Sequence, residues 1–209
     1  MSLVPALEWR YATKTYDPSK QLSAEQFGDL LRTVQLAPSS YGLQPYQFIT
    51  ITDPAKLEQI SRAAFGQPQI TTASKLLVVA VETNISEATV KNYIDKAASV
   101  RQTDRKNLEP REQFVNSKLN LLSPAQKISW AEKQAFLAVG ILVSAAAEAG
   151  IDASPMEGFD RGQIDQILGL GEQNLQSALL FALGYRSSDD EFARIPKVRK
   201  TAEELFPTV

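Results

Sequence analysis

The most restrictive feature of this sequence is residues 135–149, a segment in which nearly every side chain is apolar. Ser123 and Pro124 upstream are typical of a helix start, and Gly150 is typical of a helix end, so we expect one long helix between them. A helix that is apolar on all sides has to be buried on all sides. In a chain of 209 residues, this predicts a helix at the centre of the domain or in an interface between subunits.

The surrounding patterns predict an α+β chain. Apolar and β-branched runs predict strands at Tyr46–Ile51, Lys75–Glu82 and Leu175–Tyr185, the second covered on both faces. Capping residues and helical periodicity predict helices at 3–10, 24–37 and 54–64, at 160–168 and over much of 86–122. Residues 154–160 are expected to form a tight connection between two helices. Because long helical stretches separate the strands, simple hairpins cannot account for the sheet.

The composition excludes several kinds of chemistry. The chain has no Cys and no His, so it has no thiolate nucleophile, no Ser-His-Asp triad and no thiolate or imidazole metal ligand. An enzyme with this composition would give the difficult chemistry to a cofactor. The net charge of −2 offers no basic field for nucleic acid. No signal peptide or membrane-length apolar run is evident, so we expect one domain over 1–209, located in the cytoplasm without a membrane partner.

Three candidates for a binding site stand out, and the first is a set of cations in two separate segments. Neither GxGxxG nor GxxxxGK[ST] is present, so a bound phosphate would have to be held by side-chain cations. Arg10 and Lys14 follow the first helix, and Lys197 and Arg199 alternate near the end of the chain. The second candidate is the loop at residues 37–48, and the third is the segment SPMEGFD at residues 154–160. Taken singly, each has an ordinary explanation: surface cations, a turn with its capping residues, and a solvated carboxylate.

Six segments, in order, together resemble one known family. They are RYATKTYDPSKQL, APSSYGLQPYQF, ASKLLVVAV, WAEKQAFLAVG, GIDASPMEGFD and IPKVRK, and they extend over nearly the whole chain. The sequence is similar to the FMN-dependent nitroreductases, in the branch of oxygen-insensitive NAD(P)H nitroreductases and dihydropteridine reductases. The resemblance implies an α+β homodimer with a mixed central sheet flanked by helices and a long central helix at the interface. It also implies that the tail, about 196–209, reaches the partner subunit.

The resemblance also implies a set of FMN contacts. Arg10, Lys197 and Arg199 correspond to the clamp for the phosphate and ribityl groups, and Tyr11, Ala12 and Lys14 to the stretch that lines the flavin. Lys14 is expected near the pyrimidine edge, where its charge would stabilise negative charge on the ring. Gln69 falls in the segment that recognises the other ring edge. The remaining positions are Pro38, Ser39 and Ser40, expected from the other subunit, and Pro155, Met156, Glu157 and Gly158, with the Glu157 N–H donating to flavin N5.

The implied activity is hydride transfer from NADH or NADPH to flavin N5, and then to a nitroaromatic, a quinone or a similar flat acceptor in the same pocket. This is a ping-pong cycle that needs no protein thiol or imidazole. Tyr11 and Ala12 stand where some relatives have His and Ser, and Gly42 stands where some have Asn. Two alternatives remain open. One is an FMN-binding carrier or sensor with little turnover, and the other is a scaffold in which the motifs serve packing alone.

Overall fold

A computed structural model describes residues 2–208 of the chain. The helices are α1 (Leu3–Trp9), α2 (Ala24–Leu36), α3 (Pro54–Ala63), α4 (Pro68–Thr72), α5 (Glu87–Arg101), α6 (Glu109–Leu119), α7 (Pro124–Glu148), α8 (Arg161–Leu168) and α9 (Ala202–Leu205). The strands are β1 (Tyr46–Ile51), β2 (Lys75–Glu82), β3 (Asp152–Met156) and β4 (Leu175–Gly184). Short 3-10 turns lie at η1 (Ser40–Gly42), η2 (Arg105–Leu108), η3 (Gly171–Gln173) and η4 (Glu191–Arg194).

The predicted helix starts are confirmed by their caps. Ser23 and Gln26 form both hydrogen bonds of a capping box at the start of α2. Ser123 and Gln126 do the same for α7, where Pro124 occupies the first helical position. These caps satisfy N–H groups that have no partner within a helix, which explains why both helices begin where the sequence predicts.

The four strands form one sheet in the order β1-β2-β4-β3, and all three pairings are antiparallel. Among the described residues, the parallel pairing is an isolated bridge between Ala12, which lies outside the four strands, and Ala153 of β3. The α+β architecture is therefore as expected, but the sheet is mixed only through this bridge. β2 lies inside the sheet, in agreement with its nearly continuous apolar sequence.

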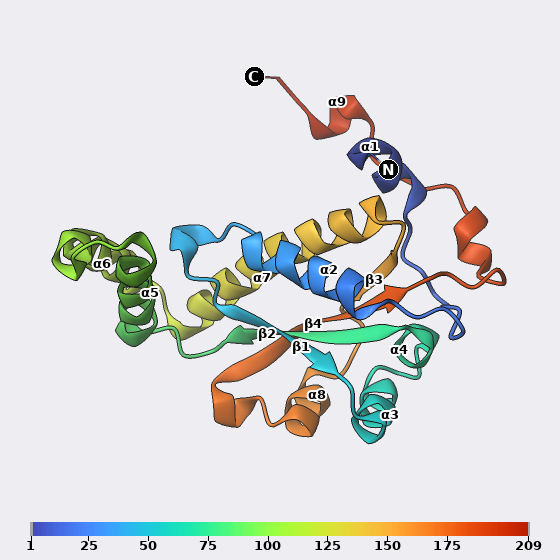
Figure 1. The fold of residues 1–209 in the computed structure, drawn as a ribbon, viewed down its shortest axis with the longest axis horizontal. Helices are drawn as coiled ribbons and strands as arrows, with labels where there is room; N and C mark the ends of the chain where they lie inside the picture. Colours follow the sequence, from blue (N-terminus) through green and yellow to red (C-terminus); the bar gives the residue numbers. More distant parts are fainter. Residues whose placement is uncertain (1, 209) are drawn as a thin grey trace.

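Helices cover both faces of the sheet (Figure 1). Leu77 and Val79 of β2 pack in a core with residues of α2 and α7, whereas Leu76 and Val78 pack in a second core with residues of α3 and α8. This alternation follows from the period of two residues in a strand. The predicted burial of β2 on both faces is confirmed.

The expected helix–helix connection at residues 154–160 is wrong, because residues 152–156 form strand β3. The strand is short, and its Pro155 argues against a strand when the sequence is read alone. β3 pairs with β4 at one end of the strand order, a position where a missing backbone N–H is tolerated. The loop that contains Glu157 and Gly158 therefore begins at the end of a sheet strand.

The expected burial of residues 135–149 on every side is also wrong within one chain. Ala138 and Leu142 of α7 are fully buried, but Phe136, Leu137 and Ile141 are 40%, 46% and 37% exposed. The helix contacts α1, α2, β1, β2 and β3, which cover only part of its surface. Of the two positions that the sequence allows for this helix, the exposed apolar face favours the subunit interface.

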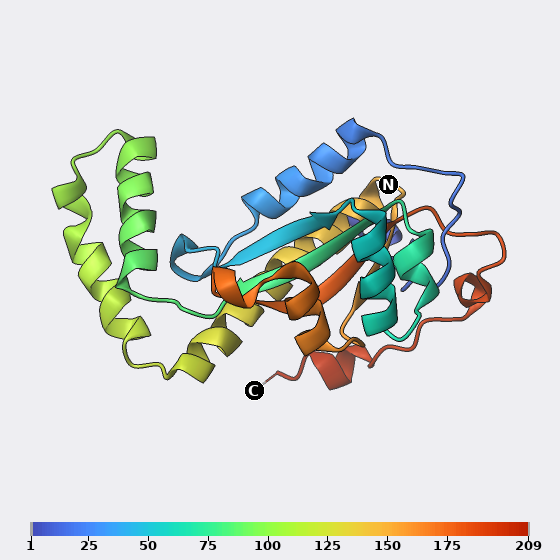
Figure 2. The same ribbon diagram turned by 90° about the horizontal axis from the view of Figure 1, so that it is seen from below.

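Two parts of the chain stand apart from the sheet in both views (Figures 1 and 2). Helices α5 and α6 pack on each other at one end of the molecule. The exposed segment after η4 starts near the other end, runs back past α1 and carries α9 (Figure 1). Among residues 2–208, no helix is both long and apolar enough to span a membrane.

Candidate functional site

The N-terminal segment that follows α1 is fixed against β3 and the end of β4. Ala12 bridges Ala153 in parallel, and Tyr16 bridges Arg186 in antiparallel fashion. Tyr16 is 1% exposed, and its hydroxyl donates to the Ala182 carbonyl at 3.1 Å. Residues 10–16 therefore form an extended stretch beside the sheet, with its position set by both strands.

Arg10, Lys197 and Arg199 lie near enough to one another at the start of this stretch for their charges to act on one another. Lys197 donates through its ammonium group to the carbonyl of Glu8. Burial lowers the pKa of Arg10, and the nearby charge of Arg199 lowers it further. Burial and then the charges of Arg10 and Arg199 also lower the pKa of Lys197. Two segments almost 190 residues apart in sequence thus bring like charges together.

This cation cluster has the chemistry of an anion site. Across the described residues, none of its three side chains forms a salt bridge. The Nε of Arg10 is buried and has no hydrogen-bond partner within residues 2–208. Clustered cations with an unused donor are electrostatically costly until an anion binds between them. The three side chains therefore fit the phosphate of a bound FMN.

The segments around Gln69 and Gly158 lie side by side. Gln67, the residue before α4, donates from Nε2 to the Gly158 carbonyl at 2.6 Å. Gln69 is 2% exposed, and its Oε1 has no hydrogen-bond partner among residues 2–208. Glu157 and Gly158 are exposed, directly after the buried Met156. A buried amide acceptor next to an exposed loop fits recognition of the edge of a ring that carries an N–H group.

The Pro38–Ser40 segment lies elsewhere in the chain. It follows α2 at the opposite end of α7 from α1, as both ribbon views show (Figures 1 and 2). The Ser40 N–H donates to Oε1 of Gln134 on α7 at 2.8 Å, and Tyr41 stacks on Trp130. One chain therefore does not bring these residues to the cation cluster, in accord with the expectation that they serve a second subunit.

Asp152 and Arg186 form an ion pair beneath the N-terminal stretch, and sequence reasoning missed it. Arg186 donates from Nη2 to Asp152 Oδ1 at 2.6 Å and from its backbone N–H to Oδ2 at 2.8 Å. The guanidinium group also lies over the rings of Trp9 and Tyr11, 4.1 and 4.6 Å from their centroids. No local pattern marks these residues, because the partners are 34 positions apart.

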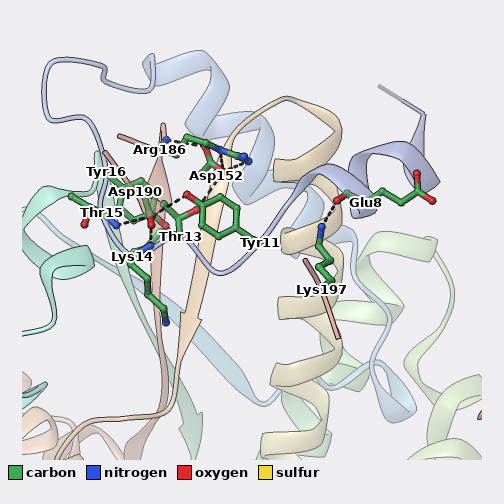
Figure 3. Close-up of polar contacts among 11 residues, drawn as sticks. Glu8, Tyr11, Thr13, Lys14, Thr15, Tyr16, Asp152, Arg186, Asp190 and Lys197 are labelled. Carbon is green, nitrogen blue, oxygen red and sulfur yellow. Dashed lines mark hydrogen bonds and ion pairs between the residues drawn. The ribbon is translucent and has the colours of Figure 1, made fainter. Parts of the chain in front are cut away.

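Asp190 is a second buried carboxylate that the sequence did not single out. Tyr11 donates to it from its hydroxyl at 2.9 Å, and burial together with this hydrogen bond raises the pKa of Tyr11. The Tyr11 hydroxyl is therefore protonated and committed to Asp190. The Lys14 side chain points away from Asp190 (Figure 3), and its ammonium group lies 5.9 Å from the centre of the Phe192 ring.

Comparison with known proteins agrees with this geometry. The model of the nitroreductase family matches residues 7–185. YfkO of Bacillus subtilis, provisionally named an NAD(P)H nitroreductase, is 31% identical, and the match covers 99% of this chain and 97% of that protein. The oxygen-insensitive NAD(P)H nitroreductase of Salmonella typhimurium is 29% identical, with both chains covered in full.

A solved structure shares the fold. A provisionally assigned nitroreductase from Exiguobacterium sibiricum, crystallised in complex with FMN, superposes with a TM-score of 0.84. It is 20% identical, and the match covers 98% of this chain and 96% of that one. Because the family model extends over most of the sequence and a 31% identical relative matches almost end to end, the chain belongs to the nitroreductase family.

Proposed function

We propose that this chain is an FMN-dependent NAD(P)H oxidoreductase that reduces nitroaromatics, quinones or similar flat electron-poor acceptors by a ping-pong cycle. In this proposal, residues 1–209 form a single flavin-binding domain, and two copies assemble as a homodimer. The observation that carries it is the cluster of Arg10, Lys197 and Arg199, whose charges act on one another and none of which forms a salt bridge among residues 2–208. The NAD(P)H nitroreductase names of the relatives and the FMN complex of the Exiguobacterium sibiricum protein support it.

Each proposed contact has a definite task. The cation cluster holds the phosphate and ribityl groups, which fixes the cofactor at one end. Tyr11, Ala12 and Lys14 line the flavin, with the Lys14 ammonium near N1 and the C2 carbonyl of the pyrimidine edge, and the carbonyl of Gln69 would accept from N3–H, on the other side of the C2 carbonyl. The backbone from Pro155 through Met156 and Glu157 to Gly158 lies against the ring, with the Glu157 N–H directed at N5. When bound, FMN would supply the hydride-transfer chemistry at its N5, which no side chain of this composition provides.

The apolar face of α7 supports the homodimer. Phe136, Leu137 and Ile141 are exposed on this helix, and Leu3 and Val4 of α1, which contacts α7, are 46% and 66% exposed. An exposed apolar surface of this kind is typical of a subunit interface. A dimer formed there would bring Pro38, Ser39 and Ser40 of the partner subunit to each flavin, and the tail of each chain would reach across its partner.

The proposed dimer can be tested with a substitution that introduces one charged side chain on the exposed face of α7. Ile141→Asp places a carboxylate on each side of the α7 face, so we expect the dissociation constant of the dimer to rise at least about 100-fold. Light scattering after size-exclusion chromatography would show the mass fall from twice 23.0 kDa to 23.0 kDa. Phe65→Asp is the matched control, because Phe65 is 73% exposed beyond α3 on the other face of the sheet. A monomeric wild-type protein would contradict the assembly.

Double-mixing stopped flow tests the catalytic proposal. We expect NADH or NADPH to bleach the flavin absorbance near 450 nm at about 1 s⁻¹ or faster, a rate typical of enzyme turnover. A nitroaromatic or quinone in the second mix should then restore the absorbance at a comparable rate. A carrier or sensor would bind FMN but show slow bleaching with both nicotinamides. That result would replace the enzyme proposal with the alternative one.

A further inference from the structure

Asp190 contacts two segments that the proposed site needs. It lies between β4 and η4 and is 4% exposed. Its Oδ2 accepts from the Tyr11 hydroxyl at 2.9 Å, the Lys14 N–H at 2.7 Å and the Thr15 N–H at 3.0 Å (Figure 3). Its Oδ1 accepts from the Phe192 N–H at 3.1 Å and so caps η4. One carboxylate oxygen of Asp190 therefore binds the N-terminal stretch, and the other caps η4, the first turn of the C-terminal segment.

The hydrogen bonds require a charged acceptor. Burial alone would raise the pKa of Asp190, but the N–H groups of Thr15 and Lys14 and the Tyr11 hydroxyl outweigh burial, so the pKa lies below its ordinary value. All hydrogen-bonding partners of its carboxylate in the described chain are donors. An Asn at this position would have to turn an N–H₂ group toward some of these donors, and would lose the contacts that the charge strengthens.

The contacts position the cation cluster. Arg10 directly precedes the stretch that Asp190 binds, and η4 leads within a few residues to Lys197 and Arg199. Beyond η4 the segment is exposed, and Lys197 reaches back to α1 through its hydrogen bond to the Glu8 carbonyl. The separation between Arg10 and the two C-terminal cations therefore depends on how firmly η4 is held against residues 11–15.

We propose that Asp190 is a positioning residue that fixes the C-terminal segment to the Tyr11–Thr15 stretch and thereby sets the spacing of the cations that bind the flavin phosphate. The inference rests on the proposed function for its ligand. It assigns Asp190 a larger effect on the phosphate end than on the ring, because the stretch that lines the ring is also held by the bridges of Ala12 to Ala153 and of Tyr16 to Arg186. Riboflavin has the same ring and no phosphate, so the ratio of the two affinities isolates this effect.

The test compares Asp190→Asn with Asp189→Asn, which removes the same charge from the exposed neighbouring residue. In fluorescence titrations of apo-protein, we expect D190N to weaken FMN binding about tenfold or more and riboflavin binding less than about threefold. D189N should bind both flavins as the wild type does. If D190N loses FMN and riboflavin by the same factor, or binds FMN within about threefold of the wild type, the inference is overturned.

Two further measurements keep the inference testable. Tyr11→Phe removes one of the four hydrogen bonds to the Asp190 carboxylate and can replace D190N in the test if D190N does not fold. We expect it to show the same preferential loss of FMN, by about threefold. Without any flavin, trypsin should cleave apo-D190N after Arg194 or Lys197 about tenfold faster than apo-D189N, because cleavage follows the population of the open segment. Equal cleavage would contradict the inference.

The proteolysis result does not depend on the ligand. Failure of the wild-type protein to bind FMN would therefore refute the proposed function without deciding the role of Asp190 in holding the segment.

Discussion

The Arg10→Ala/Arg199→Ala variant is expected to bind FMN at least about 100-fold more weakly than the wild-type protein, while it remains folded and dimeric. Each charge-assisted hydrogen bond to a phosphate is worth about 1.5–3 kcal/mol, so loss of two exceeds this factor even after screening by solvent. Equilibrium titration of the apo-protein with FMN measures the change. Lys200→Ala is the control, since it removes another cation from the same exposed segment.

The same variant separates a binding role from a structural one. Arg10 is half-buried, and its pKa is lowered by burial and by the charge of Arg199, so these cations repel each other in the absence of an anion. We therefore expect the apo form of the double variant to be as resistant to urea as the wild type, or more so. FMN binding at wild-type affinity would contradict the assigned clamp. A large loss of apo-protein stability would indicate that the arginines serve the fold.

The second large effect is expected at Asp152. Asp152→Ala leaves the Arg186 guanidinium, only 24% exposed, without its carboxylate, and removes the acceptor for the Arg186 and Thr13 donors. Breaking one side of such a buried pair costs about 3–5 kcal/mol of unfolding free energy. Urea denaturation followed by circular dichroism measures it.

A surface pair provides the comparison for Asp152. Glu132→Ala breaks the ion pair with Arg161, whose side chains are 27% and 48% exposed, and should cost less than about 1 kcal/mol. If the two variants lose similar stability, the Asp152–Arg186 pair does not anchor the N-terminal stretch as described.

The elements that sequence reasoning predicted are those whose signals are local. Ser23 and Ser123 predict helix starts, because the capping residue and its glutamine partner are only three residues apart in the sequence. The sequence of β2 predicts a strand, because a strand that is buried on both faces has to be apolar nearly throughout. β3 was missed because it is short and contains Pro155, a residue that only its place at the end of the strand order makes acceptable.

The candidate site divides in the same way. Arg10, Lys197 and Arg199 were predicted as a clamp from the order of the motifs along the chain, and in the structure their charges act on one another. Asp190 was not found because its contacts with Tyr11 and Lys14 join residues more than 170 positions apart. Nothing in the local sequence distinguishes it from Asp189, and only the fold shows which of the two is buried. Similarly, composition alone cannot decide whether an apolar helix face meets its own chain or a second copy.

Reconstitution with FMN followed by anaerobic titration tests the central claim most directly. Apo-protein mixed with FMN and passed through a desalting column should retain about one flavin per chain, as for a tightly bound cofactor. One equivalent of NADH or NADPH under anaerobic conditions should then remove the yellow colour. Loss of the flavin on the column, or a retained flavin that neither nicotinamide bleaches, would contradict the account.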